Sequence, residues 1–173
     1  METNILSKTE LRKQAKEIRK TLDIKSISKA FVELIKNNIH YKNSKNIMIF
    51  YPKKYEINLL ELTKDDKNFY LPKVKGDDLE VCPYIDETQL ELSEFGVLEP
   101  ATNQVDKNLL DLVVVPALLV DKNKFRLGYG KGFYDRFLKD FKGTTICVIP
   151  KELVVEKLPI DEFDLSVNQV IIM

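Results

Sequence analysis

Three glycines at alternate positions, flanked by two cations, form the most informative pattern in this sequence of 173 residues. Gly128, Gly130 and Gly132 follow Arg126 and enclose Lys131 in the run RLGYGKG, and they are half of the six glycines in the chain. Glycines let the backbone approach a ligand closely and point N–H groups at it. Arg and Lys add full charges that bind phosphate oxygens. This composition indicates a cradle for a phosphorylated ligand.

The loop matches neither of the common phosphate-binding motifs. A P-loop requires Ser or Thr directly after its lysine, where this chain has Gly132, and the dinucleotide fingerprint GxGxxG has a different second spacing. A glycine-rich segment before a helix can also be a simple tight turn. The concentration of glycines between an arginine and a lysine favours the ligand site over the turn.

Asp135 follows in the first turn of a helix predicted from Gly132 or Phe133 to Phe141. Two interpretations remain open for its carboxylate. It either complements the helix dipole, with Lys139 as its i,i+4 partner, or it holds Mg²⁺ against nucleotide phosphates. Phe133 shares the apolar face of this helix, so we expect it to pack into the core.

Hydrophobic strands that alternate with helices must position this loop. Ser7 and Glu10 form a capping-box pattern at the start of the first predicted helix. The polar stretch 86–108 is expected to be an ordered loop. Buried strands between helices predict an α/β protein, a sheet with helices on its faces, in a single domain over residues 1–173. Helices are predicted over 7–22, 26–37 and 57–62, and strands over 46–51, 69–71, 79–84, 112–115, 144–149 and 170–172.

Charge and hydropathy exclude several classes of protein. Apolar residues make up 44% and charged residues 31%, which excludes a disordered tail and a collagen. The net charge is zero, so the basic excess typical of a nucleic-acid binder is absent. Residues 1–45 hold 11 bases against 5 acids, and residues 120–142 hold 7 against 3. For most of these lysines a solvated surface is the favoured interpretation, and the alternative is that the two basic segments meet at one polyanionic ligand. The longest apolar run, Leu112 to Val120, is too short to span a bilayer.

The two cysteines and residues 1–4 indicate in which cellular compartment the protein is expected. Cys82 and Cys147 lie far apart without metal-ligand spacing, so we interpret them as free thiols in a reducing compartment, the cytoplasm. Residues 1–4 lack the basic and apolar regions of a signal peptide. The single histidine, His40, is expected to be a surface or capping residue that follows a helix.

The chain resembles the 5-formyltetrahydrofolate cyclo-ligase family, also called methenyltetrahydrofolate synthetases. The family's run VPGLAFD…RLGYGKGYYDRFL reads VPALLVD…RLGYGKGFYDRFL here, and shorter matches are KTELR, YEI, EP and LPIDEFDLSVNQVI. The chain departs from the family pattern at Ala117, Val120, Phe163 and Asn168, where the family has Gly, Phe, often His, and Asp. The resemblance implies a Rossmann-like, three-layer α/β/α sandwich around a mostly parallel sheet.

The resemblance also implies a role for each matching residue. It implies that Arg126, Lys131 and Asp135 take part in the chemistry, and that Asp135 and Asp164 associate with Mg²⁺. The residues implied to contact ATP are Lys8, Arg12, Arg126, Gly128, Tyr129, Gly130, Lys131, Gly132, Phe133 and Tyr134. Those implied to contact the folate are Tyr51, Glu56, Tyr129, Gly130, Lys131, Gly132 and Phe133.

The activity implied by the resemblance is the ATP-dependent cyclisation of 5-formyltetrahydrofolate to 5,10-methenyltetrahydrofolate, with release of ADP and phosphate. A nucleotide- or phospholigand-binding module on the same fold is the first alternative. An RNA-associated relative is the second, although the chain lacks the basic face with exposed aromatic residues that it would need. We expect a monomer that acts on a small molecule and binds neither nucleic acid nor membrane.

Overall fold

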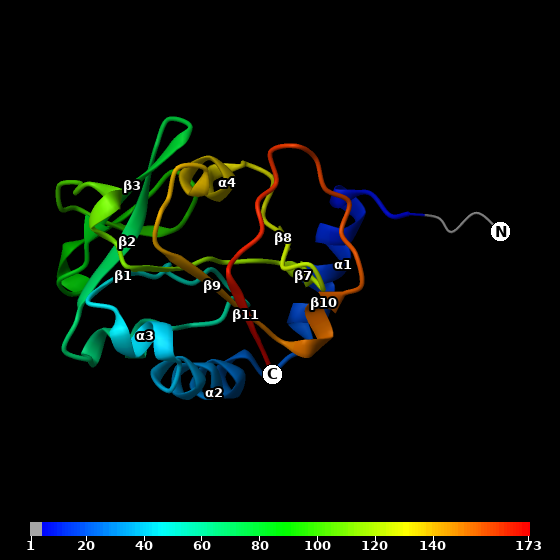
Figure 1. The fold of residues 1–173 in the computed structure, drawn as a ribbon, viewed down its shortest axis with the longest axis horizontal. Helices are drawn as coiled ribbons and strands as arrows, with labels where there is room; N and C mark the ends of the chain where they lie inside the picture. Colours follow the sequence, from blue (N-terminus) through cyan, green and yellow to red (C-terminus); the bar gives the residue numbers. More distant parts are fainter. Residues whose placement is uncertain (1–4) are drawn as a thin grey trace.

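A six-stranded sheet forms the centre of the computed structural model, which describes residues 5–173 (Figure 1). Residues 1–4, which carry the expectation about a signal peptide, lie outside this range. The strand order is β11-β9-β6-β1-β2-β3, and every neighbouring pair is parallel except β2 and β3. The strands are β1 (Asn46–Met48), β2 (Asn68–Lys75), β3 (Asp78–Pro83), β6 (Leu112–Val114), β9 (Thr144–Ile149) and β11 (Gln169–Ile172).

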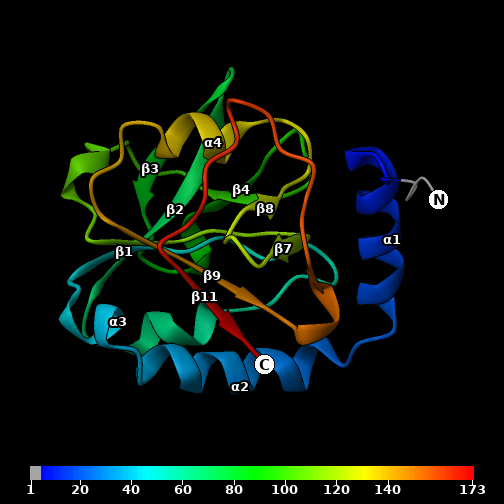
Figure 2. The same cartoon turned by 45° about the vertical axis from the view of Figure 1, so that its right-hand side comes forward.

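Successive side chains of the central strands enter two separate cores, as the period of a strand requires. Ile47 belongs to the cluster beneath helices α2 (Ile24–Lys36) and α3 (Ile39–Asn43), whereas Met48 belongs to the cluster on the opposite face. That opposite face is covered by α1 (Lys8–Lys20) and α4 (Phe133–Leu138). Figure 2 shows α2 and α3 on one side of the sheet and α4 on the other. The predicted three-layer α/β arrangement is confirmed.

Helix α1 begins as its sequence predicts. Ser7 accepts a hydrogen bond from the N–H of Glu10, and the Glu10 carboxylate accepts one from the N–H of Ser7, which completes the capping box. The 11 positions from Lys8 to Arg19 correspond to about three helical turns, so Lys8, Arg12 and Arg19 lie on one face of α1.

Two predicted helices differ from the structure. Helix α4 ends at Leu138 instead of Phe141, because a single turn closes from the Phe141 N–H to the Leu138 carbonyl and the Phe141 ring stacks on Phe137. The helix predicted over 57–62 is a 3-10 helix, η1 (Leu60–Lys64). His40 lies inside the short helix α3, where its N–H donates to the Asn38 side chain.

The segment expected to be a loop, 86–108, contains regular structure. It forms an antiparallel hairpin of β4 (Leu90–Leu92) and β5 (Leu98–Pro100) between the 3-10 turns η2 (Glu87–Gln89) and η3 (Lys107–Leu109). A second small sheet has the order β10-β7-β8, from β7 (Leu119–Asp121), β8 (Arg126–Leu127) and β10 (Val154–Val155), and η4 (Lys151–Leu153) precedes β10. Strands this short carry too few residues for a period to be recognised in sequence.

Two composition-based expectations can be compared with the structure. Cys82 and Cys147 are both buried free thiols. Within residues 5–173, none of the helices combines the length and the apolar character needed to cross a membrane.

Candidate functional site

One cavity of about 880 Å³ collects the residues that the sequence singled out. It lies beside α1, the loop between β8 and α4, the residues that follow β1, and the segment before β11. The structure therefore brings together positions that are up to 156 residues apart in the chain. All fourteen predicted site residues line it: Lys8, Arg12, Tyr51, Glu56, Arg126, Gly128, Tyr129, Gly130, Lys131, Gly132, Phe133, Tyr134, Asp135 and Asp164.

The glycine-rich loop is held against α1 by an arginine. Arg12 Nε donates to the Gly128 carbonyl at 2.9 Å, and the rest of its guanidinium lies over Gly130. Gly130 has φ +99°, in the region that L side chains rarely adopt. Part of the reason for glycine in this loop is therefore internal to the protein, because the Arg12 guanidinium packs against the loop backbone.

Arg126 stands at the base of this loop with an unused donor. Its guanidinium carbon lies 5.3 Å from the centre of the Tyr134 ring. Its Nε is buried and finds no acceptor among the described residues. A buried N–H group without a partner is costly. The guanidinium as a whole lines the cavity, where its charge suits an anionic ligand.

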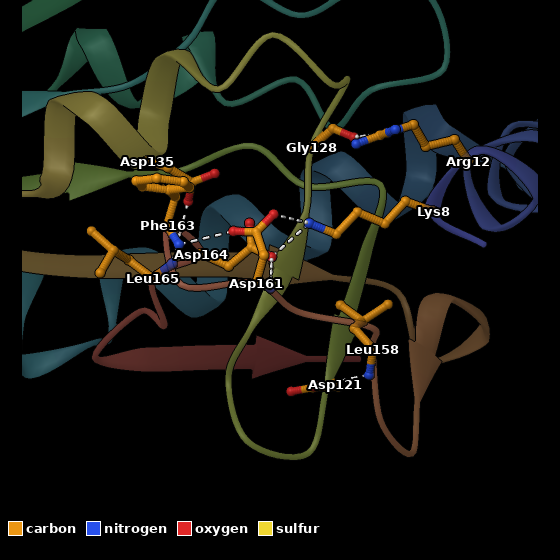
Figure 3. A network of polar contacts seen from close by, with 10 residues as sticks. All are labelled: Lys8, Arg12, Asp121, Gly128, Asp135, Leu158, Asp161, Phe163, Asp164 and Leu165. Carbon is orange, nitrogen blue, oxygen red and sulfur yellow. Dashed lines mark hydrogen bonds and ion pairs between the residues drawn. The ribbon is translucent and has the colours of Figure 1, made fainter. Parts of the chain in front are cut away.

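An ion-pair cluster closes the same end of the cavity (Figure 3). Lys8 Nζ lies 2.6 Å from Asp164 Oδ2 and 3.3 Å from Asp161 Oδ2. Burial alone would lower the pKa of Lys8, but the contacts with the two carboxylates outweigh it and raise that pKa. Asp161 is a residue that the sequence did not point to, since nothing in its spacing sets it apart from other surface acids.

Asp135 faces this cluster from the first turn of α4. Its Oδ1 accepts a hydrogen bond from the Leu165 N–H at 3.4 Å. Burial raises the pKa of Asp135, Arg126 opposes that rise, and the neighbouring charge of Asp164 adds to it. The structure thus places Asp135 close to Asp164. The sequence did not suggest its hydrogen bond with the Leu165 N–H.

Asp135 and Asp164 offer two carboxylates to the same cavity. In the described part of the chain, Asp135 Oδ2 and Asp164 Oδ1 lie outside the hydrogen bonds named above. No group of three or more His, Cys, Asp or Glu side chains suited to a metal is found within residues 5–173. Mg²⁺ is usually held by one or two carboxylates together with substrate phosphates, not by a complete protein cage. The residues present therefore fit Mg²⁺ that arrives with a polyphosphate.

Glu56 and Tyr129 form a second polar group on another wall of the cavity. Glu56 is 7% exposed, and its Oε1 accepts the Lys53 N–H at 2.7 Å. Burial raises the pKa of Glu56, which the Lys53 N–H and the charges of Lys53 and Arg19 oppose. Lys53 Nζ lies 3.9 Å from the centre of the Tyr129 ring. Sequence reasoning missed Lys53, because one lysine among many carries no signal of its own.

The remaining wall is apolar, and it corrects one expectation. Phe133 does not enter the core: its ring meets Phe95 edge-on, with centroids 6.1 Å apart, on the lining of the cavity. Phe133 does belong to a helix, as predicted, but α4 is short and buries only Phe137 and Leu138 at its C-terminal end. The other apolar residues of this wall come from the hairpins β2–β3 and β4–β5: Pro72, Val74, Leu79, Val97 and Leu98.

Two buried charges outside the ligand-facing set position the segments that carry it. Arg19, 4% exposed, donates to the carbonyls of Tyr55, Ala117 and Leu118, and so ties α1 to the backbone next to Glu56. Asp121 accepts N–H groups from Asn123, Phe125 and Leu158, and so ties the turn before Arg126 to the segment that leads to Asp164.

Fold and site together define an α/β protein with a cavity lined by two chemically different sets of residues. One set consists of cations, loop N–H groups and two carboxylates, which suit a polyphosphate. The other set consists of apolar and aromatic side chains and a buried carboxylate, which suit a planar organic molecule with a few polar groups. A cavity of this kind is typical of enzymes that act on two substrates at once.

The model of the 5-formyltetrahydrofolate cyclo-ligase family matches residues 4–173, and the chain belongs to this family of ligases. The 5-formyltetrahydrofolate cyclo-ligase of Haemophilus influenzae is 30% identical over 151 residues, covering 79% of this chain and 80% of that protein. The mouse 5-formyltetrahydrofolate cyclo-ligase is 27% identical, covering 76% and 74%.

Solved structures agree with this placement. The NMR structure of Aquifex aeolicus 5,10-methenyltetrahydrofolate synthetase superimposes with a TM-score of 0.85 at 31% identity, and covers 96% of this chain and 90% of that one. A 5,10-methenyltetrahydrofolate synthetase from Mycoplasma pneumoniae has the same fold, with a TM-score of 0.73 at 22% identity.

Proposed function

We propose that this chain catalyses the ATP-dependent cyclisation of 5-formyltetrahydrofolate to 5,10-methenyltetrahydrofolate, with ADP and phosphate as the other products. The observation that carries the proposal is the single cavity on which the phosphate-type residues and the apolar, aromatic residues both converge. A module that only bound a nucleotide would need the phosphate-type residues and an apolar surface for the base, but it would need neither the buried Glu56 nor Asp135. Membership of the cyclo-ligase family supports the choice of substrates.

The chemical difficulty of the reaction is that a formamide oxygen is a poor leaving group. We infer that the γ-phosphoryl group of ATP is transferred to the formyl oxygen, which breaks the bond to ADP and forms an imidate-like phosphate. The other folate nitrogen then attacks the activated carbon, loses its proton, and inorganic phosphate leaves with the former formyl oxygen. In both steps the protein's main contribution is to hold the reactants in line, and no protein nucleophile is required.

The polyphosphate end supplies the charge stabilisation. Arg126 offers its guanidinium, and Lys131 and the loop N–H groups add further donors to the transferring phosphoryl group. Lys8 and Arg12 hold ATP from α1. Asp135 and Asp164 would hold Mg²⁺, which neutralises phosphate charge when it is bound.

The apolar end orients the folate. Glu56 accepts hydrogen bonds from the ring or the side chain of the substrate, and Tyr51, Tyr129 and Phe133 offer aromatic surface for stacking. Since every group named here comes from one chain, we propose that a monomer is sufficient for activity. The free thiols support a reducing compartment, the cytoplasm.

A near-ultraviolet absorbance assay tests the proposal directly. Purified protein is mixed with 5-formyltetrahydrofolate, ATP and Mg²⁺, and the longer-wavelength band of the methenyl product is followed. We expect ATP-dependent growth of that band, abolished in Arg126→Ala and Asp135→Ala and retained in Lys142→Gln, which removes an exposed charge outside the cavity. ATP binding without any product band would overturn the proposal in favour of a nucleotide-binding module.

A further inference from the structure

Arg136 bridges two walls of the cavity through main-chain carbonyls. Its Nε and Nη2 donate to the carbonyl of Asp77 at 2.8 and 2.5 Å, and Nη2 also donates to the carbonyl of Lys131 at 3.0 Å. Asp77 lies in the turn between β2 and β3, whereas Lys131 lies in the glycine-rich loop. One guanidinium therefore joins the apolar wall to the phosphate-binding wall.

The hairpin at one end of this bridge extends away from β1. The Val74 N–H also holds it to the hairpin β4–β5, by donating to the Glu99 carboxylate at 2.7 Å. Strand β1 pairs with β2 only as far as Tyr70, so the hairpin extends beyond the central sheet with β3 as its paired strand. Isolated two-stranded hairpins are only marginally stable. Pro72, Val74 and Leu79 of this extension line the cavity, so its position decides the shape of the apolar end. Figures 1 and 2 both show the tip of the hairpin next to α4.

The other end of the bridge lies next to Gly132, where a positive φ favours glycine. An added Cβ at Gly132, which has φ +71°, would come within 2.7 Å of Arg136 Nη1. The guanidinium also lies 5.4 Å from the centre of the Phe133 ring, which in turn meets Phe95 of the hairpin β4–β5. Both hairpins of the apolar wall thus contact the start of α4.

We propose that Arg136 is a positioning residue that fixes the apolar, folate-side wall relative to the glycine-rich loop; the kinetic part of this inference rests on the proposed function. The side chain acts on the position of the hairpin β2–β3 and not as a ligand of ATP. Its fork geometry is essential, since the single ammonium nitrogen of a lysine cannot occupy the positions of both Nε and Nη2.

The test compares Arg136→Lys with the wild type in steady-state kinetics and in hydrogen exchange. Because a small misplacement of a binding wall costs affinity steeply, we expect KM for 5-formyltetrahydrofolate to rise about tenfold in Arg136→Lys, while KM for ATP changes by less than about twofold. Amides of residues 74–79 should exchange about tenfold faster in the free variant, because the tip is released locally. A residue with a merely structural role would lower thermal stability without separating the two KM values.

Two matched variants sharpen the test. Asp77→Asn keeps the main-chain carbonyl and removes the carboxylate, so it should leave both KM values unchanged. Lys142→Gln removes one exposed charge shortly after α4 and should do the same. An Asp77→Asn variant that reproduces the Arg136→Lys defect would show an ion pair and would overturn the proposal.

Two further outcomes would also overturn it: a selective rise in KM for ATP, which would mean direct contact with phosphate, or unchanged hydrogen exchange at residues 74–79. Hydrogen exchange needs no turnover. If the wild type is inactive but exchange is faster in Arg136→Lys, the proposed reaction is rejected. The positioning role of Arg136 is then still supported.

Discussion

The guanidinium of Arg12 lies directly over Gly130, with its Nε bonded to the Gly128 carbonyl at 2.9 Å. Gly132 and Gly128 repeat the relationship with Arg136 and Arg126, so each glycine of the loop is next to an arginine side chain. Three of the four arginines in this lysine-rich chain are used here. The alternate glycines provide the space in which these planar cations reach the loop, and the arginines fix the loop before any ligand arrives.

Gly130→Ala is therefore expected to weaken ATP binding. The substitution introduces strain of about 1 to 2 kcal/mol at a positive φ, and its Cβ would come within 3.3 Å of Arg12 Cζ. We expect a lower melting temperature together with a raised KM for ATP. Gly96→Ala is the matched control, because Gly96 has φ +73° and no atom within 4 Å of the added Cβ. Equal effects of the two variants on KM for ATP would contradict the role of the Arg12 contact.

The two ion pairs of Lys8 are expected to differ in importance. Asp164 is the closer and more buried partner, whereas the Asp161 side chain is 57% exposed and its pair is screened by water. Lys8→Met should raise KM for ATP by at least about tenfold, since a charged donor is lost. Asp161→Asn should change it by less than about threefold, as for other exposed pairs. Steady-state kinetics at saturating folate gives both values, and a defect of equal size in the two variants would refute this ranking.

Asp135→Asn is expected to raise the Mg²⁺ concentration required for half-maximal activity. Burial raises the pKa of the Asp135 carboxyl above its ordinary value of 3.8, so the carboxylate needed for the metal is lost as the pH falls through that raised pKa. The wild type should lose activity at acidic pH, and added Mg²⁺ should displace the acid limb to lower pH. A Mg²⁺ titration over a pH series measures both. An acid limb that does not respond to Mg²⁺ would assign the limb to another group.

Glu56→Gln should separate activity from stability. Burial raises the pKa of Glu56 above its ordinary value of 4.5, so the folded state binds this proton more tightly than the unfolded state does. This contribution to stability is therefore present below the unfolded pKa and is lost as the pH rises through the folded pKa. At neutral pH the variant should melt at a higher temperature than the wild type and bind the folate more weakly. Thermal melts from pH 4 to 8 test this, and a constant difference across the range would contradict it.

Local patterns in the chain determined most of the framework. The capping box at Ser7, the apolar strands around Val113 and Cys147, and the glycine-rich loop after Arg126 are each encoded within a few residues, so their sequence neighbours suffice to predict them. The fourteen site residues were also named from sequence, with the help of a motif long enough to identify the family. The cavity lining contains all of them.

Tertiary structure alone decided how those residues are used. Three contacts join segments that are far apart in sequence: Lys53 with the Tyr129 ring, Asp161 with Lys8, and Arg136 with the Asp77 carbonyl. Each contact depends on a backbone position that no local pattern specifies. Phe133 leaves the core for the same reason, because its environment is set by the hairpin that carries Phe95. Periodicity determines which face of an element is apolar, whereas the packing of other segments determines whether that face meets the core or a ligand.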